Sequence, residues 1–407
     1  MKPAKPILIL AFAALFGPVA AFAQKELVVW HAYRGGEKAA FEKVVAAWNA
    51  ANPNVKVTTL AVPYDAYADK ISAAVPRGKG PDVFIYAQDR LGGWIEAGNT
   101  IEPLDFFLDD ATKGRFLPST LQAMTYRGTI WGLPLNYKVL TLIYNKKLLT
   151  KPPATSGELV ATAKKLTDPA AGRFGLVYWY SDFYVHSGLM NAFGGGAFDQ
   201  DRQPTVNLPA NVKSIELVLK WLNQDKFLPA EPSTALITAL FNSGKAAMVW
   251  NGPWFLGEIA KDVDYGLALL PRIDEAGGTP MKPWATIEGA YIAAPSKNKD
   301  AAYDFIKFLT DTPQARVLAL DGRQSPSNKA VYDDAAVKSD WILTHFRKQF
   351  EVAVPMPNIP EMSMFWSPAT TAMNAIVKGS ATPAAALSEA QDKVKKDVER
   401  LRKGSGG

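Results

Sequence analysis

Residues 27–86 read LVVWHAYRGGEKAAFEKVVAAWNAANPNVKVTTLAVPYDAYADKISAAVPRGKGPDVFIY, and this stretch decides the fold class. Three short apolar runs predict buried strands, at 27–30, 55–60 and 83–86. Two segments between them predict helices, at 37–51 and 64–74. The first helix has an apolar face that includes Phe41, Val44 and Trp48, and Pro53 ends it. Strands that alternate with helices in this way predict an α/β fold with a largely buried sheet.

A second stretch of the same kind begins near Leu140. Its strands and helices are predicted at 176–178, 211–223 and 246–250, and Thr382-Pro383 predicts the start of a long final helix. The 407 residues exceed the ~250–300 at which a single core stops growing. No Ser/Gly/Pro-rich linker divides the chain into two independent domains. We therefore expect two lobes joined by short crossover segments, near 136–139, 284–288 and 321–326.

The first residues indicate export. Lys2 and Lys5 precede an apolar run at 7–16, and Ala21-Phe22-Ala23 resembles a cleavage site. We expect a signal peptide at 1–23 and a periplasmic or extracytoplasmic protein that starts at Gln24. The sequence contains no cysteine, so we do not expect a lipid anchor.

The remaining composition argues against several classes of function. The formal net charge is +6 with no basic run, which does not favour nucleic-acid binding. Three scattered histidines and no cysteine do not favour a metal site or a cofactor. No catalytic motif occurs, so we expect no enzyme. Paired carboxylates of a secreted glycosidase remain open, as does binding of a peptide or polyamine.

An aromatic and charged segment follows the strand at 83–86. Tyr86 is followed by Asp89 and Arg90 at the end of that strand, where ligands bind in open α/β sheets. Aromatic rings can pack on the C–H faces of sugars, and neighbouring acidic and basic groups can bind hydroxyls. The alternative is a surface ion pair that caps the next helix. From these residues alone, both interpretations stay open.

Five segments resemble the bacterial maltose/maltodextrin-binding proteins, which are the extracellular solute-binding proteins of ABC sugar importers. They occur in the family's order and span essentially the whole mature chain. They are GPDVFIYAQDRLGGW at 80–94, LTLIYNKKLL at 140–149, FNSGKAAM at 241–248, NGPW at 251–254 and MPNIPEMSMFW at 356–366. The last is the most specific, whereas FNSGKAAM alone indicates only the wider sugar-binding group.

The resemblance implies a two-lobed periplasmic-binding-protein fold, with a cleft at a three-stranded hinge. It implies an N-lobe from 24–136 and 287–322 and a C-lobe from 139–284 and 325–402. The Gly-Ser-Gly-Gly ending itself predicts a disordered tail at 403–407. The resemblance also implies a set of sugar-binding residues: Asp89, Arg90 and Tyr86 on the N-lobe, with Asp182, Tyr184, Trp254, Trp366 and Met356 opposite them. Arg34 and Lys138 join this set as stand-ins at positions where the sequence departs from the family.

These departures concern the ligand rather than the class. The family commonly carries a glutamate where Lys138 stands, and an arginine where Thr370 stands. The first loop, which contains Arg34, aligns loosely. The expected function is capture of a maltose- or maltodextrin-type sugar by a monomeric protein that delivers it to a membrane permease. Trehalose or another sugar stays open as the ligand.

Overall fold

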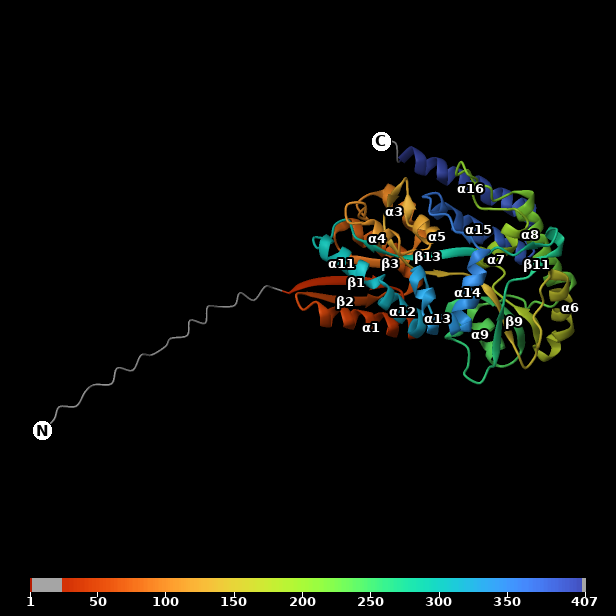
Figure 1. Cartoon of the computed structure of the whole chain (residues 1–407). Helices are drawn as coiled ribbons and strands as arrows, with labels where there is room; N and C mark the ends of the chain where they lie inside the picture. Colours follow the sequence, from red (N-terminus) through yellow and green to blue (C-terminus); the bar gives the residue numbers. More distant parts are fainter. Residues whose placement is uncertain (2–23, 405–407) are drawn as a thin grey trace.

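The computed structural model describes residue 1 and residues 24–404, which form two α/β lobes side by side (Figure 1). The two-lobed α/β fold predicted from the sequence is confirmed. Each lobe has its own sheet, and the chain crosses between the lobes more than once. The expected signal sequence after Met1 and the last three residues of the expected tail lie outside the described residues.

The N-lobe contains a sheet of seven strands within the described residues, in the order β14-β6-β13-β3-β1-β2 with β15 beside β13. Its first part comprises β1 (Lys25–His31), α1 (Gly35–Ala51), β2 (Val55–Ala61), α2 (Tyr64–Ala74), η1 (Val75–Arg77), β3 (Val83–Ala87), η2 (Gln88–Arg90), α3 (Leu91–Ala97), α4 (Asp110–Lys113), α5 (Pro118–Ala123), β4 (Thr125–Tyr126), β5 (Thr129–Ile130) and β6 (Leu133–Lys138). Its second part comprises β13 (Trp284–Ile292), α11 (Lys299–Leu309), α12 (Thr312–Gly322), β14 (Ser325–Pro326), η6 (Lys329–Asp333) and α13 (Ala335–Ser339).

Helices cover both faces of this sheet, which explains why its strands are continuous apolar runs. In β3, Phe84 and Tyr86 pack in one core cluster, with residues of α2 and α3. Val83 and Ile85 point to the other face and pack with residues of α1 and α11. Side chains of a strand alternate between its two faces, so one short run supplies two cores.

The C-lobe contains a sheet of four strands within the described residues, in the order β10-β7-β9-β8. Its elements are β7 (Thr141–Asn145), α6 (Ser156–Leu166), η3 (Pro169–Ala171), β8 (Phe174–Val177), α7 (Phe183–Ala192), α8 (Pro209–Leu219), η4 (Lys220–Gln224), α9 (Thr234–Asn242), β9 (Ala246–Asn251), α10 (Pro253–Leu256), β10 (Tyr265–Ala268), β11 (Arg272–Ile273), η5 (Asp274–Ala276), β12 (Thr279–Pro280), α15 (Met362–Val377) and α16 (Pro383–Gly404). The helix predicted at 211–223 continues beyond α8 as the π-helical segment η4, in which Trp221 is fully buried.

Two crossings between the lobes lie next to each other. The chain leaves β6 at Lys138 and enters the C-lobe sheet in β7, and it returns along β13. Thr286 of β13 lies opposite Lys138 of β6 in antiparallel register. Figure 1 shows β13 running between the lobes. At its start, Trp284 packs with residues of α15 and α16, whereas Ile287 packs in the N-lobe core.

The third connection is longer than the sequence suggests. Ser325 and Pro326 still pair with β6 in the N-lobe sheet, although the C-lobe was expected to begin at 325. Helix α14 (Trp341–Glu351) and strand β15 (Val354–Pro355) follow before the C-lobe helices begin. Phe346 packs α14 into the N-lobe core, while Gln349 accepts a hydrogen bond from the Leu270 backbone N–H of the C-lobe at 2.9 Å.

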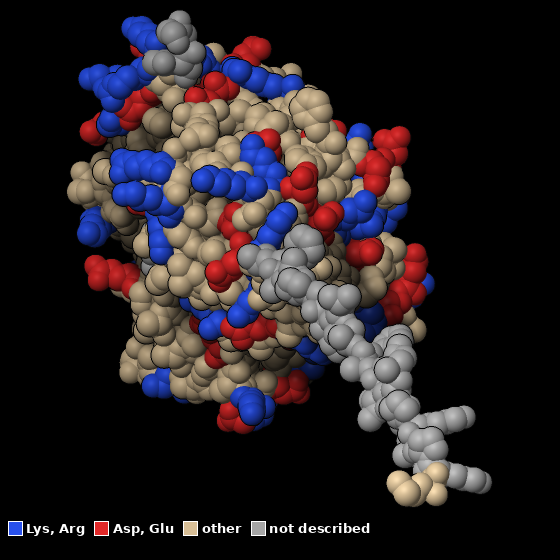
Figure 2. Space-filling view, turned by 90° about the vertical axis from the view of Figure 1, so that its left-hand side faces the viewer, with Lys and Arg blue, Asp and Glu red and all other residues tan. Residues whose placement is uncertain are grey.

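The final helix, α16, packs on the C-lobe with a buried face of Leu387, Ala390, Val394 and Val398. It continues to Gly404, two residues into the segment expected to be a disordered tail. No helix of the described residues combines the length and the apolar character needed to cross a membrane. On the face that Figure 2 shows, basic and acidic side chains are interspersed.

Candidate functional site

Asp89 lies directly beyond the carboxyl end of β3, in the short turn η2. Asp89 is only 6% exposed. Its contact with Arg90 is therefore not the surface ion pair that the sequence alone left open. Burial raises the pKa of Asp89 to about 6, and the neighbouring charge of Arg90 opposes that rise. Nε of Arg90 lies 3.4 Å from Oδ2 of Asp89. A carboxylate held in this way is ionised at neutral pH and can accept hydrogen bonds.

Two buried N–H groups beside Asp89 lack hydrogen-bond partners. They are Nε of Arg90 and Nε1 of Trp366, neither of which makes a hydrogen bond of ordinary geometry within the described residues. The Trp366 indole nevertheless lies close enough to Asp89 to help lower the pKa of that carboxyl against the effect of burial. Unpaired buried polar groups are uncommon, and each calls for an explanation. Here they place two donors around one carboxylate, a set that suits ligand hydroxyls.

Two aromatic residues of the C-lobe extend the site. Tyr184 of α7 and Trp254 of α10 are partly buried, with 6.3 Å between their ring centroids. The hydroxyl of Tyr184 accepts a hydrogen bond from Thr286 of β13 at 3.2 Å. A Cβ at Gly252 would lie 2.1 Å from the Trp254 ring. The glycine of the NGPW motif therefore permits the position that this indole occupies.

Three other expected site residues have structural contacts of their own. Tyr86 is buried and stacks on Tyr64. Asp182 is the N-cap of α7 and accepts the Val185 backbone N–H at 3.0 Å. Met356 is buried, and its carbonyl accepts a hydrogen bond from the Gln88 side chain at 3.1 Å. The Gln88–Met356 hydrogen bond holds the turn after β3 against the segment that leads to α15.

Lys138 lies between two carboxylates. Its Nζ is 3.1 Å from Oε1 of Glu37 and 3.1 Å from Oε1 of Glu288. Burial alone would lower the pKa of Lys138, but the charges of Glu288 and Glu37 outweigh it and raise that pKa. The three groups come from α1, β6 and β13. At this position the chain therefore has an ion-pair cluster at the crossing strands.

Arg34 contacts a different part of the structure from Asp89. Its guanidinium is largely exposed and lies 3.6 Å from Glu258, which follows α10 in the C-lobe. Leu256 of α10 also packs against the N-lobe core. The structure therefore has the lobes in contact at this edge.

Sequence reasoning missed Tyr64, Glu37 and Glu288. Tyr64 begins α2, and its ring stacks on Tyr86 with centroids 5.6 Å apart and planes 9° apart. The only sequence signal for Tyr64 was its place at the start of a predicted helix, shortly after a predicted strand. Glu37 and Glu288 were not detectable because their partner, Lys138, lies about 100 and 150 residues away in the chain.

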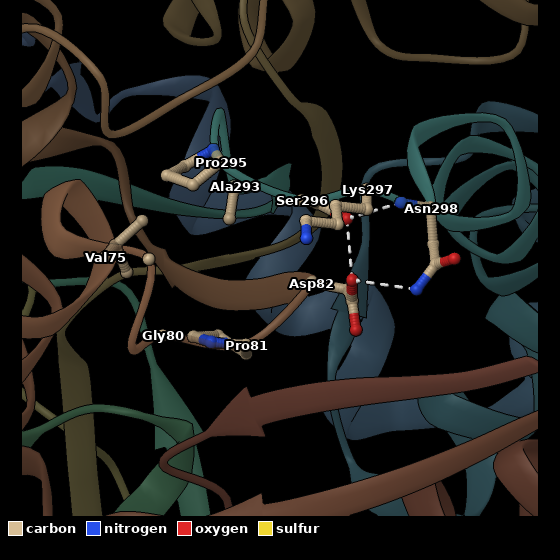
Figure 3. Close-up of a pocket in the computed structure, with 10 residues that line it drawn as sticks. Val75, Gly80, Pro81, Asp82, Ala293, Pro295, Ser296, Lys297 and Asn298 are labelled. Atoms are coloured by element: carbon tan, nitrogen blue, oxygen red, sulfur yellow. Dashed lines mark hydrogen bonds between the residues drawn. The ribbon is translucent and has the colours of Figure 1, made fainter.

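A separate hollow of about 240 Å³ lies at the opposite end of β3 (Figure 3). Its floor includes Asp82, which precedes β3, whereas Asp89 follows that strand. Asp82 accepts hydrogen bonds from the Ser296 hydroxyl at 2.6 Å and from the Val28 backbone N–H at 3.0 Å. The Asp82 carboxylate therefore joins the segment before β3 to strand β1 and to the loop that contains Ser296. Among the described residues, no cluster of three or more acidic or histidine side chains could hold a metal ion.

Residues 34–316 match the family model described as bacterial extracellular solute-binding protein. The chain belongs to this family. A maltotriose-binding protein of Pyrococcus abyssi is 31% identical over 381 residues, covering 92% of this chain and 83% of the relative. A galactooligosaccharide-binding protein of Bacillus subtilis is 27% identical over 394 residues, covering 93% and 91%.

This extracellular solute-binding protein is also similar to a solved structure. The maltose/maltodextrin-binding domain MalE from Bdellovibrio bacteriovorus, bound to maltotriose, is 28% identical with a TM-score of 0.85. The match covers 92% of this chain and all of that domain. The resemblance stated from the five sequence segments is therefore confirmed.

Proposed function

We propose that this protein captures a maltodextrin-type oligosaccharide between its lobes and delivers it to the permease of an ABC importer. The observation that carries the proposal is the buried Asp89 carboxylate, with unpaired N–H groups of Arg90 and Trp366 beside it. A sugar hydroxyl can both donate to a carboxylate and accept from an N–H group, so it matches this set. Tyr184 and Trp254 add aromatic faces on the C-lobe side.

Closure is the mechanism that this arrangement favours. Asp89 and Arg90 belong to the N-lobe, whereas Tyr184, Trp254 and Trp366 belong to C-lobe helices. A ligand that contacts both sets binds the closed conformation better than the open one. Its differential affinity therefore shifts the population toward closure. The closed conformation is what the permease would recognise.

Isothermal titration calorimetry with a sugar panel tests this function. The panel contains maltose, maltotriose, maltotetraose, trehalose and a galactooligosaccharide. We expect one-site binding of the α-1,4-linked glucose oligomers, with lower affinity for the other two sugars. Tighter binding of trehalose or the galactooligosaccharide would keep the transport role and change the ligand. Absence of binding to every sugar would contradict the proposal.

The proposal includes binding without turnover. Purified protein held with maltotriose for a day should return the sugar intact, as chromatography of the mixture would show. Release of glucose in proportion to protein concentration would favour a secreted glycosidase. We further propose an exported, monomeric protein without a lipid anchor, since the sequence has no cysteine to carry one. Sedimentation and fractionation of the producing cells test these points.

A further inference from the structure

Tyr64 has contacts that no sequence motif indicated. It lies at the start of α2, three residues after β2 ends. Strands β2 and β3 both run parallel to β1, so their carboxyl ends lie at the same edge of the sheet. Tyr64 therefore shares that edge with Asp89. Its ring stacks on Tyr86, which in turn lies edge-on to Trp94 at 5.3 Å.

Tyr64 is an exposed residue that has protein packed against one side of its ring. The residue is 54% exposed to solvent. Burial nevertheless raises the pKa of its hydroxyl well above the usual value, and the nearby Tyr86, Asp89 and Glu288 raise it further. These two observations agree if protein surrounds the ring on several sides while one face stays open to water. The stacking on Tyr86 supplies one covered side, at the sheet edge that Tyr64 shares with Asp89.

The ring is also held in a defined position. One face packs against Tyr86, which is only 6% exposed and belongs to the core of the sheet. A flat ring that is fixed on one side and open on the other can stack on a ligand. Little further conformational entropy is lost when the ligand binds. Asp89 is buried, whereas Tyr64 is half exposed, so Tyr64 lies farther out than Asp89.

We propose that Tyr64 is a further binding residue, which stacks on an outer glucose unit of the oligosaccharide and so favours ligands of three or more units. The inference rests on the proposed function, because it takes Asp89 as the centre of the same site. Because Tyr64 lies farther out than Asp89, we expect a disaccharide bound around Asp89 to leave most of the open face of the Tyr64 ring free. A longer ligand gains that aromatic contact.

The affinities of Tyr64→Ala and Tyr64→Phe for maltose and maltotetraose test the proposal by calorimetry. Tyr64→Ala should weaken maltotetraose binding about five- to tenfold and change maltose binding less than twofold. Tyr64→Phe keeps the ring and should keep most of the affinity for the longer sugar. Phe106→Ala is the matched control, because it removes a ring of the same lobe that is 96% exposed.

The outcomes separate this inference from the proposed function. If the wild-type protein binds no glucose oligomer, the function itself is wrong. If wild type binds both sugars and Tyr64→Ala binds them equally well, the outer contact is wrong and the function stands. Equal weakening for both sugars would place Tyr64 beside the inner unit and overturn the chain-length claim. Melting curves without sugar verify that each variant is folded.

Discussion

The hydroxyl of Tyr126 in the N-lobe accepts a hydrogen bond from Nη1 of Arg202 in the C-lobe, across 3.3 Å. Tyr126 in turn donates to Glu96, and Arg202 lies 3.6 Å from the buried Glu361. This chain of polar contacts joins the lobes directly. Together with Arg34–Glu258, it provides a second contact between them.

Removing the Tyr126 hydroxyl should make the closed conformation less stable without removing a contact to the sugar. Tyr126→Phe loses the hydrogen bond from Arg202, so the closed conformation becomes less populated and the apparent sugar affinity falls about two- to fivefold. Calorimetry with maltotriose measures this. Arg173→Ala is the control, since its ion pair with Asp168 lies within the C-lobe. An unchanged affinity in Tyr126→Phe would mean that the contact does not depend on closure.

Asp89→Asn should stabilise the protein without ligand while weakening sugar binding. The pKa of Asp89 is raised in the folded protein, so the ionised carboxylate favours unfolding above the unfolded-state pKa near 4. Two pKa units correspond to about 3 kcal/mol, a net value that already includes the opposing charge of Arg90, and the NH₂ group that Asn places near the Arg90 guanidinium offsets part of it. We expect a gain of about 1–2 kcal/mol at pH 7.5 that largely disappears at pH 4. Urea unfolding at both pH values measures it, and a gain equal at both would contradict the cause given.

Sugar affinity of the wild-type protein should fall as the pH drops through about 6. Below that pH the Asp89 carboxyl is increasingly protonated and accepts hydrogen bonds less well. Calorimetry with maltotriose at pH 7.5 and 5.0 gives the two affinities. Asp89→Asn should show a much smaller pH dependence, and an identical dependence in both proteins would assign the effect to another group.

Two neighbouring tryptophans should respond differently to truncation. The ring centroids of Trp366 and Trp284 lie 5.8 Å apart. Trp284 is buried, with 2% of its surface exposed, whereas Trp366 is only partly buried. Trp366→Ala should lower sugar affinity roughly tenfold to a hundredfold, with a modest loss of stability. Trp284→Ala should cost roughly 3–5 kcal/mol of stability. Melting and calorimetry on both variants distinguish them; a large stability loss with normal affinity in Trp366→Ala would make that residue structural.

Removing the Lys138 ammonium should destabilise the crossing strands. Lys138→Met leaves Glu37 and Glu288 facing each other without their shared cation. Breaking a buried ion pair in this way costs about 3–5 kcal/mol. Urea unfolding measures the loss, and Glu37→Gln added to Lys138→Met should restore part of it. If the double variant is no more stable than Lys138→Met, carboxylate repulsion is not the cause.

Much of the fold could be predicted because the periodicity of the sequence is clear. The strands and helices expected in 27–86 agree with β1, α1, β2, α2 and β3 within two residues at each end. The long third connection was not predictable. β14 has only two residues, and α14 packs on one lobe while it bonds to the other.

The site was less accessible to sequence reasoning. Asp89 and Arg90 could be proposed because a strand end places them. Their burial, and the unpaired N–H group of Trp366, depend on segments more than 250 residues apart. The stacking of Tyr64 on Tyr86 and the carboxylates around Lys138 likewise arise only when distant segments meet.

The most direct test of capture between the lobes is an electron-paramagnetic-resonance distance measured during a sugar titration. The chain has no cysteine, so Lys56→Cys on the N-lobe and Lys165→Cys on the C-lobe would carry the only two spin labels. Both positions are exposed. We expect maltotriose to shift the distance distribution to one narrower population, saturating at one sugar per protein, and Asp89→Ala to abolish the shift at the same concentration. A distribution that maltotriose leaves unchanged would contradict closure on the ligand.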